Sequence, residues 1–251
     1  GDSGEGRRLA EILTAAGADH ADWLTHGFHS YPARMHPAVA RGVLATYATA
    51  GDRVLDPFCG SGTVLVEALV AGMRSRGVDL NPIGVRLSAV KCQQRDAKAR
   101  GRFSEVLGQV VEVSKQRVRE RASSRAPLSA GERQNYDVHV LKELAGIYEI
   151  IAEVESVPDK AALQMLLSAI VVKFSKQRAD TAEPGQDPNS RGAGRPARGG
   201  ERPRHDARPA ASSSPRRIGK FVPSEFYRRK GEELIRRWAE LDEACPEPAF
   251  R

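Results

Sequence analysis

The sequence predicts an α/β fold in which short parallel strands alternate with helices. Residues 51–73 read as strand, glycine turn and helix, and residues 74–82 read as a second strand that ends in an acidic residue. Many of the other apolar residues recur at the spacing of amphipathic helices. We therefore expect a helical part beside the sheet.

Two helices are expected before the first strand. Apolar residues in 5–25 follow a helix-compatible pattern that includes Leu9, Ile12, Leu13 and Trp23. Residues 37–48 form a second amphipathic pattern, and Pro37 suits its first turn.

The first strand and the turn after it are the most informative stretch. Val54 and Leu55 form an apolar run of the length of a buried parallel strand, and the chain continues as "LDPFCGSGT" (55–63) into a helix that stops at Gly72. Gly60 and Gly62 let the backbone approach a ligand closely, and the helix N-terminus offers unpaired N–H groups to a negative group. This geometry suits a nucleotide-like ligand.

Two phosphate-binding motifs match this turn poorly. A P-loop would have Lys followed by Ser or Thr after the second glycine, where this chain has Thr63 and Val64. A dinucleotide-binding turn would have a third glycine at position 65, which is Leu.

The second strand indicates another ligand. Asp79 lies roughly 20 residues beyond the turn, where a carboxylate at a strand tip takes ribose hydroxyls. Asp56 suits an ammonium group, while Thr63 and the helix N-terminus suit a carboxylate. Together these groups predict S-adenosylmethionine as the cofactor.

Three motifs carry a family resemblance: "HSYPARMHP" (29–37), "LDPFCGSGT" (55–63) and "GVDLNP" (77–82). In this order and spacing, the sequence resembles the S-adenosylmethionine-dependent DNA methyltransferases that modify the exocyclic amino group of adenine (N-6) or cytosine (N-4). The resemblance implies a class I (Rossmann-like) methyltransferase fold. Together with the turn, it predicts cofactor contacts for Tyr31, Pro32, Ala33, Pro37, Asp56, Pro57, Phe58, Cys59, Gly60, Ser61, Gly62, Thr63, Asp79, Leu80 and Asn81.

Simpler roles stay open for some of these residues. Asp56 could cap the following helix, Phe58 could belong to the core, and Asn81 with Pro82 could form a plain turn. Arg34 could contact the cofactor carboxylate or a DNA phosphate, or could lie in solvent.

The catalytic loop of that family is absent from this chain. The family holds the target amino group with a Pro-Pro-aromatic loop, and the 251 residues contain no Pro-Pro dipeptide. We expect the loop and the remaining strands beyond Arg251, so the predicted fold is incomplete in this chain. No catalytic residue is predicted, and the chain alone should be inactive.

The rest of the chain reads mainly as helices. Residues 83–122 suggest two helices broken near Gly101, and residues 137–156 and 159–176 suggest a helical hairpin around Pro158. Residues 179–217 lack large apolar residues and are expected to be disordered. Ser224 is expected to cap a last helix. The predicted segments are 1–50, a cofactor-binding core at 51–100, a helical insert at 101–178, the loop at 179–217, and 218–251.

Composition narrows the function classes. The net charge of +7 favours a polyanionic partner, DNA or alternatively RNA. No apolar run is long enough to cross a membrane and no leader precedes the motifs, so a cytoplasmic protein without membrane contact is expected. Three scattered cysteines, and three histidines (His26, His29 and His36) without a nearby carboxylate or thiol at ligand spacing, predict no metal site.

Two alternative functions stay open at this point. A tRNA guanine-amino methyltransferase uses a similar strand and turn, although it usually carries an RNA-binding domain before them. The chain could also be a non-catalytic remnant, or one subunit of a split enzyme whose complementary chain carries the catalytic loop.

Overall fold

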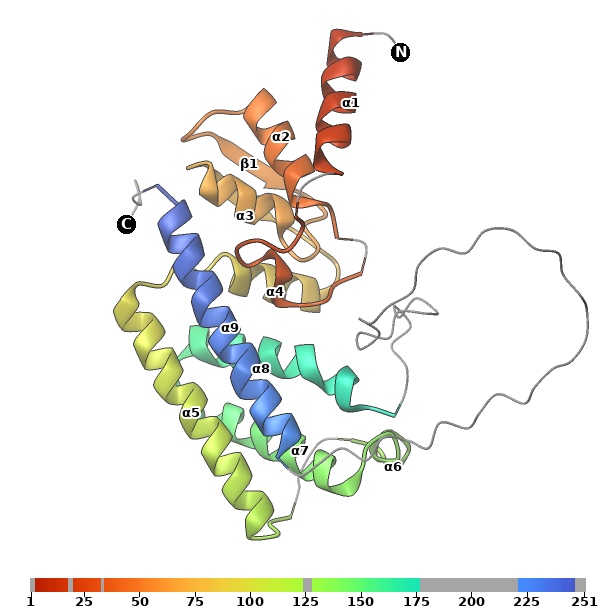
Figure 1. Ribbon diagram of the computed structural model, residues 1–251, viewed down its shortest axis with the longest axis vertical. Coiled ribbons are helices and arrows are strands. Elements are labelled where there is room, and N and C mark those ends of the chain that lie inside the picture. Colours follow the sequence, from red (N-terminus) through yellow and green to blue (C-terminus); the bar gives the residue numbers. More distant parts are fainter. Residues whose placement is uncertain (1–2, 18–19, 33, 124–127, 177–220, 247–251) are drawn as a thin grey trace, which may run out of the picture.

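The computed structural model describes residues 3–17, 20–32, 34–123, 128–176 and 221–246 (Figure 1). The loop predicted to be disordered (179–217) and Ala33 lie outside these residues. No helix among those described is long and apolar enough to span a membrane.

The amino-terminal part contains two strands among short helices. In chain order its elements are α1 (Gly4–Ala16), the 3-10 helix η1 (His26–Phe28), α2 (Pro37–Tyr47), β1 (Arg53–Asp56), α3 (Thr63–Val70), β2 (Arg74–Gly77) and α4 (Pro82–Lys91). The second part is helical and consists of α5 (Ala97–Arg119), α6 (Ala130–Arg133), α7 (Val138–Glu153), α8 (Val157–Val171), the 3-10 helix η2 (Val172–Phe174) and α9 (Val222–Ala244).

The two strands pair in parallel, with Arg53 opposite Arg74 and Asp56 opposite Gly77. The parallel strand-turn-helix-strand unit predicted from the sequence is therefore confirmed. Val54 packs with Leu44 of α2 and Ala68 of α3. Leu55, on the other face, is 65% exposed, so the expectation of a buried first strand is wrong for this residue. The described helices cover only the face that carries Val54.

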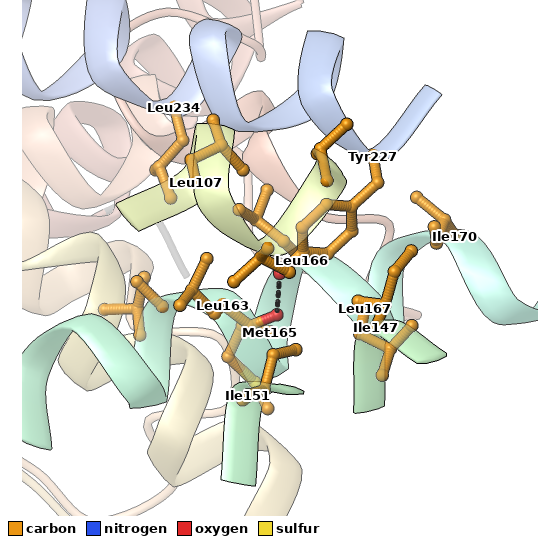
Figure 2. Packing of buried hydrophobic residues seen from close by; sticks show 14 of the residues in the cluster. Leu107, Ile147, Ile151, Leu163, Met165, Leu166, Leu167, Ile170, Tyr227 and Leu234 are labelled. Atoms are coloured by element: carbon orange, nitrogen blue, oxygen red, sulfur yellow. Dashed lines mark hydrogen bonds between the residues drawn. The ribbon is translucent and has the colours of Figure 1, made fainter. Parts of the chain in front are cut away.

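The helical part holds the main core (Figure 2). Helix α9 packs against α5, α7 and α8, and the Tyr227 hydroxyl donates to the Leu163 carbonyl at 3.0 Å. Gly231 of α9 lies tightly against Leu107 of α5, because a Cβ placed there would lie 2.3 Å from Leu107 Cδ2. The backbones of α5 and α9 can come this close only because position 231 has no side chain.

Helix α9 begins on a buried carboxylate. Glu143 of α7 accepts hydrogen bonds from the backbone N–H groups of Phe221 (2.6 Å) and Ser224 (3.1 Å) and from the Ser224 hydroxyl (2.9 Å). The prediction that Ser224 caps the helix is wrong: the helix starts at Val222, and Ser224 lies inside its first turn. A carboxylate from a distant helix satisfies N–H groups that a local cap would otherwise take.

Two other boundaries differ from the sequence prediction. The first helix ends at Ala16, so Trp23 is not part of it. The break after α4 falls at residues 92–96, where the Asp96 side chain caps α5 through Ala99 N–H, and Gly101 lies inside α5. Propensity predicts a weak point at a glycine, but the cap at Asp96 sets the start. The hairpin of α7 and α8 is confirmed, with Pro158 in the first turn of α8.

We predict opposite effects for two helical Gly→Ala substitutions. Gly231→Ala should lower the free energy of unfolding by about 1–3 kcal/mol, because the new methyl group overlaps the buried Leu107 side chain. Gly101→Ala, which has open space around it, should instead raise this free energy by about 0.5–1 kcal/mol. Urea unfolding of both variants checks the pair. Equal effects would contradict the close approach of α5 and α9.

A second prediction concerns the start of α9. Glu143→Gln should destabilise the fold by about 1–3 kcal/mol, because an amide group replaces one oxygen that accepts buried N–H groups. The matched control is Glu112→Gln, since Glu112 is exposed and pairs with the exposed Arg119. Its cost should stay below about 1 kcal/mol. Similar midpoints for both variants in urea would remove the role given to Glu143.

Candidate functional site

The glycine turn (56–62) connects β1 to α3. Asp56 accepts the Phe58 N–H at 3.1 Å, and the Gly62 N–H bonds the Cys59 carbonyl at 2.7 Å. Gly60 and Gly62 have φ of +47° and +80°, in the left-handed region that favours glycine. Gly62 is the N-cap of α3, and no side chain among the described residues caps this helix start.

Asp79 ties the turn to the second strand. One carboxylate oxygen accepts the Gly60 N–H at 2.7 Å and the other accepts the Asn81 N–H at 2.8 Å. These two bonds hold the pKa of Asp79 below its ordinary value, so its carboxylate is charged at neutral pH. A carboxylate offers about four lone pairs, so each oxygen can accept one further hydroxyl.

The segment before α2 closes on the same place. Asn81 Nδ2 donates to the Tyr31 hydroxyl at 3.2 Å, and a Cβ at Gly60 would lie 3.4 Å from Tyr31 Cε1. The Thr63 hydroxyl at the start of α3 donates to the Met35 carbonyl at 3.4 Å. The three motifs found in the sequence therefore converge on one end of the sheet.

The predicted site residues differ in how far they can reach a ligand. Phe58 is 85% exposed, and Pro32, Pro57, Leu80 and Asn81 are also exposed. Pro37, Cys59, Ser61, Gly62 and Thr63 are buried, and burial is the main cause that raises the pKa of the Cys59 thiol. The Ser61 hydroxyl has no hydrogen-bond partner among the described residues. Cofactor contact for all these residues stays a prediction, and the buried side chains also have a packing role.

Arg34 is used by the loop that carries it. Its guanidinium donates to the carbonyls of His26 and Ala21 and to the Asp22 carboxylate at 2.8 Å. These bonds hold the segment before Tyr31 in place. Of the roles left open for Arg34, none is needed to explain this arrangement.

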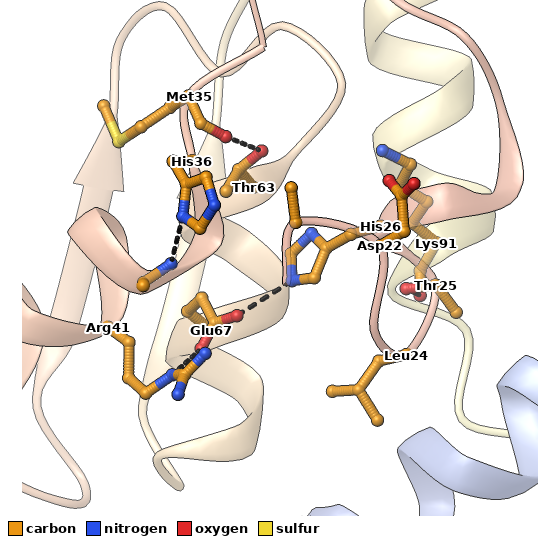
Figure 3. A network of polar contacts seen from close by, with 12 residues as sticks. Asp22, Leu24, Thr25, His26, Met35, His36, Arg41, Thr63, Glu67 and Lys91 are labelled. Atoms are coloured by element: carbon orange, nitrogen blue, oxygen red, sulfur yellow. Dashed lines mark hydrogen bonds and ion pairs between the residues drawn. The ribbon is translucent and has the colours of Figure 1, made fainter. Parts of the chain in front are cut away.

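A buried polar network lies beneath the site (Figure 3). The His26 ring bonds Glu67 of α3 at 2.8 Å through Nε2, and Arg41 Nε reaches the other Glu67 oxygen at 3.4 Å. Burial lowers the pKa of His26, against the opposing pull of Glu67, so the ring is neutral at pH 7 and donates to the carboxylate. Sequence reasoning missed Glu67. Its position in the sequence, as a single acidic residue within the apolar run of α3, could have indicated a buried carboxylate.

Lys91 is a second buried charge that sequence reasoning missed. Its side chain is fully buried at the end of α4, and Nζ has no hydrogen-bond partner among the described residues. Burial, and after it the charge of Arg34, lowers the pKa of Lys91 to about 7. Its backbone carbonyl accepts the Thr25 hydroxyl at 3.0 Å, which ties α4 to the loop that carries His26.

The three neighbouring histidines have separate partners. His26 bonds Glu67, His29 lies 3.3 Å from the Ser168 hydroxyl, and His36 caps α2 through the Ala38 N–H. Within the described ranges, no group of three or more His, Cys, Asp or Glu side chains could hold a metal ion.

The chain is similar to two curated proteins that are named type II methyltransferases. The type II methyltransferase M.MjaII of Methanocaldococcus jannaschii is 34% identical over 91 residues, 36% of this chain and 17% of the relative. The type II methyltransferase M.MvaI of Kocuria varians is 39% identical over 71 residues, 27% of this chain and 16% of the relative.

An RNA-modifying enzyme is also similar. The tRNA (guanine(10)-N2)-dimethyltransferase of Methanothermobacter thermautotrophicus is 46% identical over 52 residues, 20% of this chain and 16% of the relative. The chain thus aligns with only 16% to 17% of the length of these relatives. No solved structure matches the chain.

A family model covers more than half of the chain. The RMKL-like methyltransferase domain matches residues 28–172, which begin just before the first motif and end one residue after α8. This range contains the glycine turn, Asp79 and Tyr31. The chain therefore belongs to the family of RMKL-like methyltransferase domains.

Proposed function

We propose that this chain is the S-adenosylmethionine-binding part of a DNA methyltransferase that modifies the exocyclic amino group of adenine or cytosine. The observation that carries the proposal is the convergence of Tyr31, the glycine turn and Asp79 at the carboxyl end of the sheet. Two of the similar curated proteins are named type II methyltransferases, which supports DNA as the substrate.

The groups present fit this cofactor. The uncapped N-terminus of α3 would bind the cofactor carboxylate, and Asp56 would accept from its ammonium group. Asp79 would take the ribose hydroxyls with the lone pairs that Gly60 and Asn81 leave free. Tyr31, Pro32, Phe58 and Leu80 would form the walls. S-adenosylmethionine, when bound, supplies the methyl group that is transferred.

We further propose that the sheet is completed by strands outside this chain, to give a class I (Rossmann-like) fold. Parallel sheets are normally covered on both faces, yet Leu55 and Val78 are 65% and 55% exposed. The sequence also contains no Pro-Pro-aromatic loop to position the acceptor amino group. Both observations support a cofactor-binding part whose catalytic loop lies elsewhere, either in a longer chain or in a complementary subunit.

A tRNA guanine-amino methyltransferase is the second candidate. The similarity to a tRNA dimethyltransferase, 46% identical over 52 residues, favours it. The turn and Asp79 would hold the cofactor in the same way in both enzymes, so the acceptor distinguishes them.

Asp79→Asn should weaken binding of S-adenosylmethionine to the 251-residue chain about ten- to a hundredfold. The substitution removes the charge proposed to accept the ribose hydroxyls, and it places an amide NH₂ against a backbone N–H. Isothermal titration calorimetry measures the change in affinity.

The matched control for this prediction is Asp52→Asn. Asp52 also accepts a backbone N–H, that of Thr49 at 2.8 Å, but it lies at the opposite end of β1. The control should bind the cofactor as the parent does. If Asp79→Asn also left the affinity unchanged, Asp79 would not belong to the cofactor site.

The chain alone should transfer no methyl group to DNA or tRNA. It holds a candidate cofactor site, but nothing in its sequence matches the loop that orients the acceptor nitrogen, and orientation supplies several kcal/mol of the barrier reduction. The assay uses labelled S-adenosylmethionine with duplex DNA and with tRNA.

The same assay is repeated with the product of a neighbouring reading frame that carries a Pro-Pro-aromatic loop. If the mixture methylates DNA and the chain alone does not, the proposed function is supported. If the mixture methylates tRNA and not DNA, the second candidate is supported. Robust transfer by the chain alone would disprove the absence of a catalytic loop and point to an acceptor-binding segment within residues 83–251.

A further inference from the structure

A hollow of about 860 Å³ adjoins the candidate cofactor site. Its walls come from residues 27–31, from the end of α8 with η2, and from α9. Tyr31 belongs to both places, since its hydroxyl accepts from Asn81 beside the glycine turn and its side chain also lines the hollow. A molecule in the hollow would therefore lie next to the bound cofactor.

Phe226 lines the hollow, and three cations lie near it: Lys173 and Lys230 also line the hollow, and Arg229 contacts the Phe226 ring. Lys173 Nζ lies 4.2 Å from the centre of the Phe226 ring, and Arg229 Cζ lies 5.2 Å from it. Lys230 lines the same wall. Burial, and after it the charges of Lys230 and Arg229, lowers the pKa of Lys173.

Carboxylates neutralise this cluster only in part. Lys230 pairs with Glu233 at 2.8 Å, whereas neither Lys173 nor Arg229 has a carboxylate within ion-pair distance in the portion of the chain described. The carboxylate that lines the hollow, Asp22, is paired with Arg34 at 2.8 Å. The contacts with the Phe226 ring stabilise Lys173 and Arg229, and an anion beside them would further reduce the repulsion between the like charges.

We infer that this basic hollow, lined by Tyr31, Lys173, Phe226 and Lys230 with Arg229 beside Phe226, binds the phosphodiester backbone of the DNA substrate beside the base that is methylated. The inference rests on the proposed function. The cations come from two elements, η2 and α9, and phosphate contacts of lysine and arginine supply most of the affinity of proteins for DNA. The Phe226 ring adds a face on which an unstacked base can lie.

The test compares two pairs of substitutions that each remove one lysine and one arginine from the 251-residue chain. Lys173→Gln with Arg229→Gln changes the hollow. Lys98→Gln with Arg102→Gln removes equal charge from exposed positions on α5. Fluorescence anisotropy with labelled duplex DNA, over a range of salt concentrations, gives the affinity and its salt dependence.

The hollow pair should lower the affinity for DNA about tenfold at low salt. It should also reduce the steepness of log K against log salt by nearly two, since each phosphate contact contributes about 0.9. The α5 pair should retain the affinity and the slope of the parent. Circular dichroism confirms that both variants are folded.

Several outcomes would overturn the inference. The inference is wrong if the parent chain does not bind DNA, or if both pairs of substitutions lower the affinity for DNA equally. It is also wrong if, in the same measurement with labelled tRNA, the hollow pair weakens binding of tRNA and not of DNA. The affinity for S-adenosylmethionine, measured separately by calorimetry, distinguishes this failure from that of the proposed function. A parent that binds DNA through the hollow but binds no cofactor would refute the proposed function and leave the hollow as a DNA site.

Discussion

The start of α9 is held by the buried carboxylate of Glu143, and the far end of the same helix braces the candidate site. Trp238 Nε1 donates to the Val90 carbonyl of α4 at 3.1 Å, and Arg237 donates to the Asp22 and Leu24 carbonyls at 2.7 and 2.6 Å. These contacts fix the end of α4 and the loop that leads to Tyr31. The position of the cofactor-side segments therefore depends on contacts with a helix 148 to 215 residues further along the sequence.

The glycine turn has a second, local support in Asp79. Its pKa lies below the ordinary value because the charged form accepts two backbone N–H groups. The ionised carboxylate therefore stabilises the turn fully at pH values above the unfolded pKa of about 3.9. This stabilisation is lost as the pH falls through the lower pKa of the folded state. The turn is thus fully held at neutral pH. The same charge that shapes the turn is the one proposed to take ribose hydroxyls.

Several cations of α9 pair with carboxylates of the same helix. Arg228 pairs with Glu225 and Glu232, while Lys230 and Arg237 both pair with Glu233. These pairs turn a basic run in the sequence into a largely neutral helix face. Lys173 and Arg229, which have no ion-pair partner within the described residues, come together through the packing of η2 against α9, where Phe174 meets Phe226 edge to face. The net charge of +7 is therefore a weak guide to where DNA would bind.

The sequence by itself determined the strand, glycine turn and helix at 53–70, the acidic strand tip at Asp79 and the α7–α8 hairpin, because each depends on neighbours in the chain. Glycine at positive φ, apolar periodicity and a proline in a first turn are local signals. Tertiary structure alone decided that Leu55 is exposed and that Ser224 donates to Glu143 and does not cap its own helix. It likewise decided that α5 begins after Asp96 and is not broken at Gly101. It also decided that Tyr31 closes on Gly60, and that Glu67 and Lys91 are buried. Each of these depends on which distant side chain supplies a hydrogen bond, a charge or a covering surface, and local periodicity does not encode that.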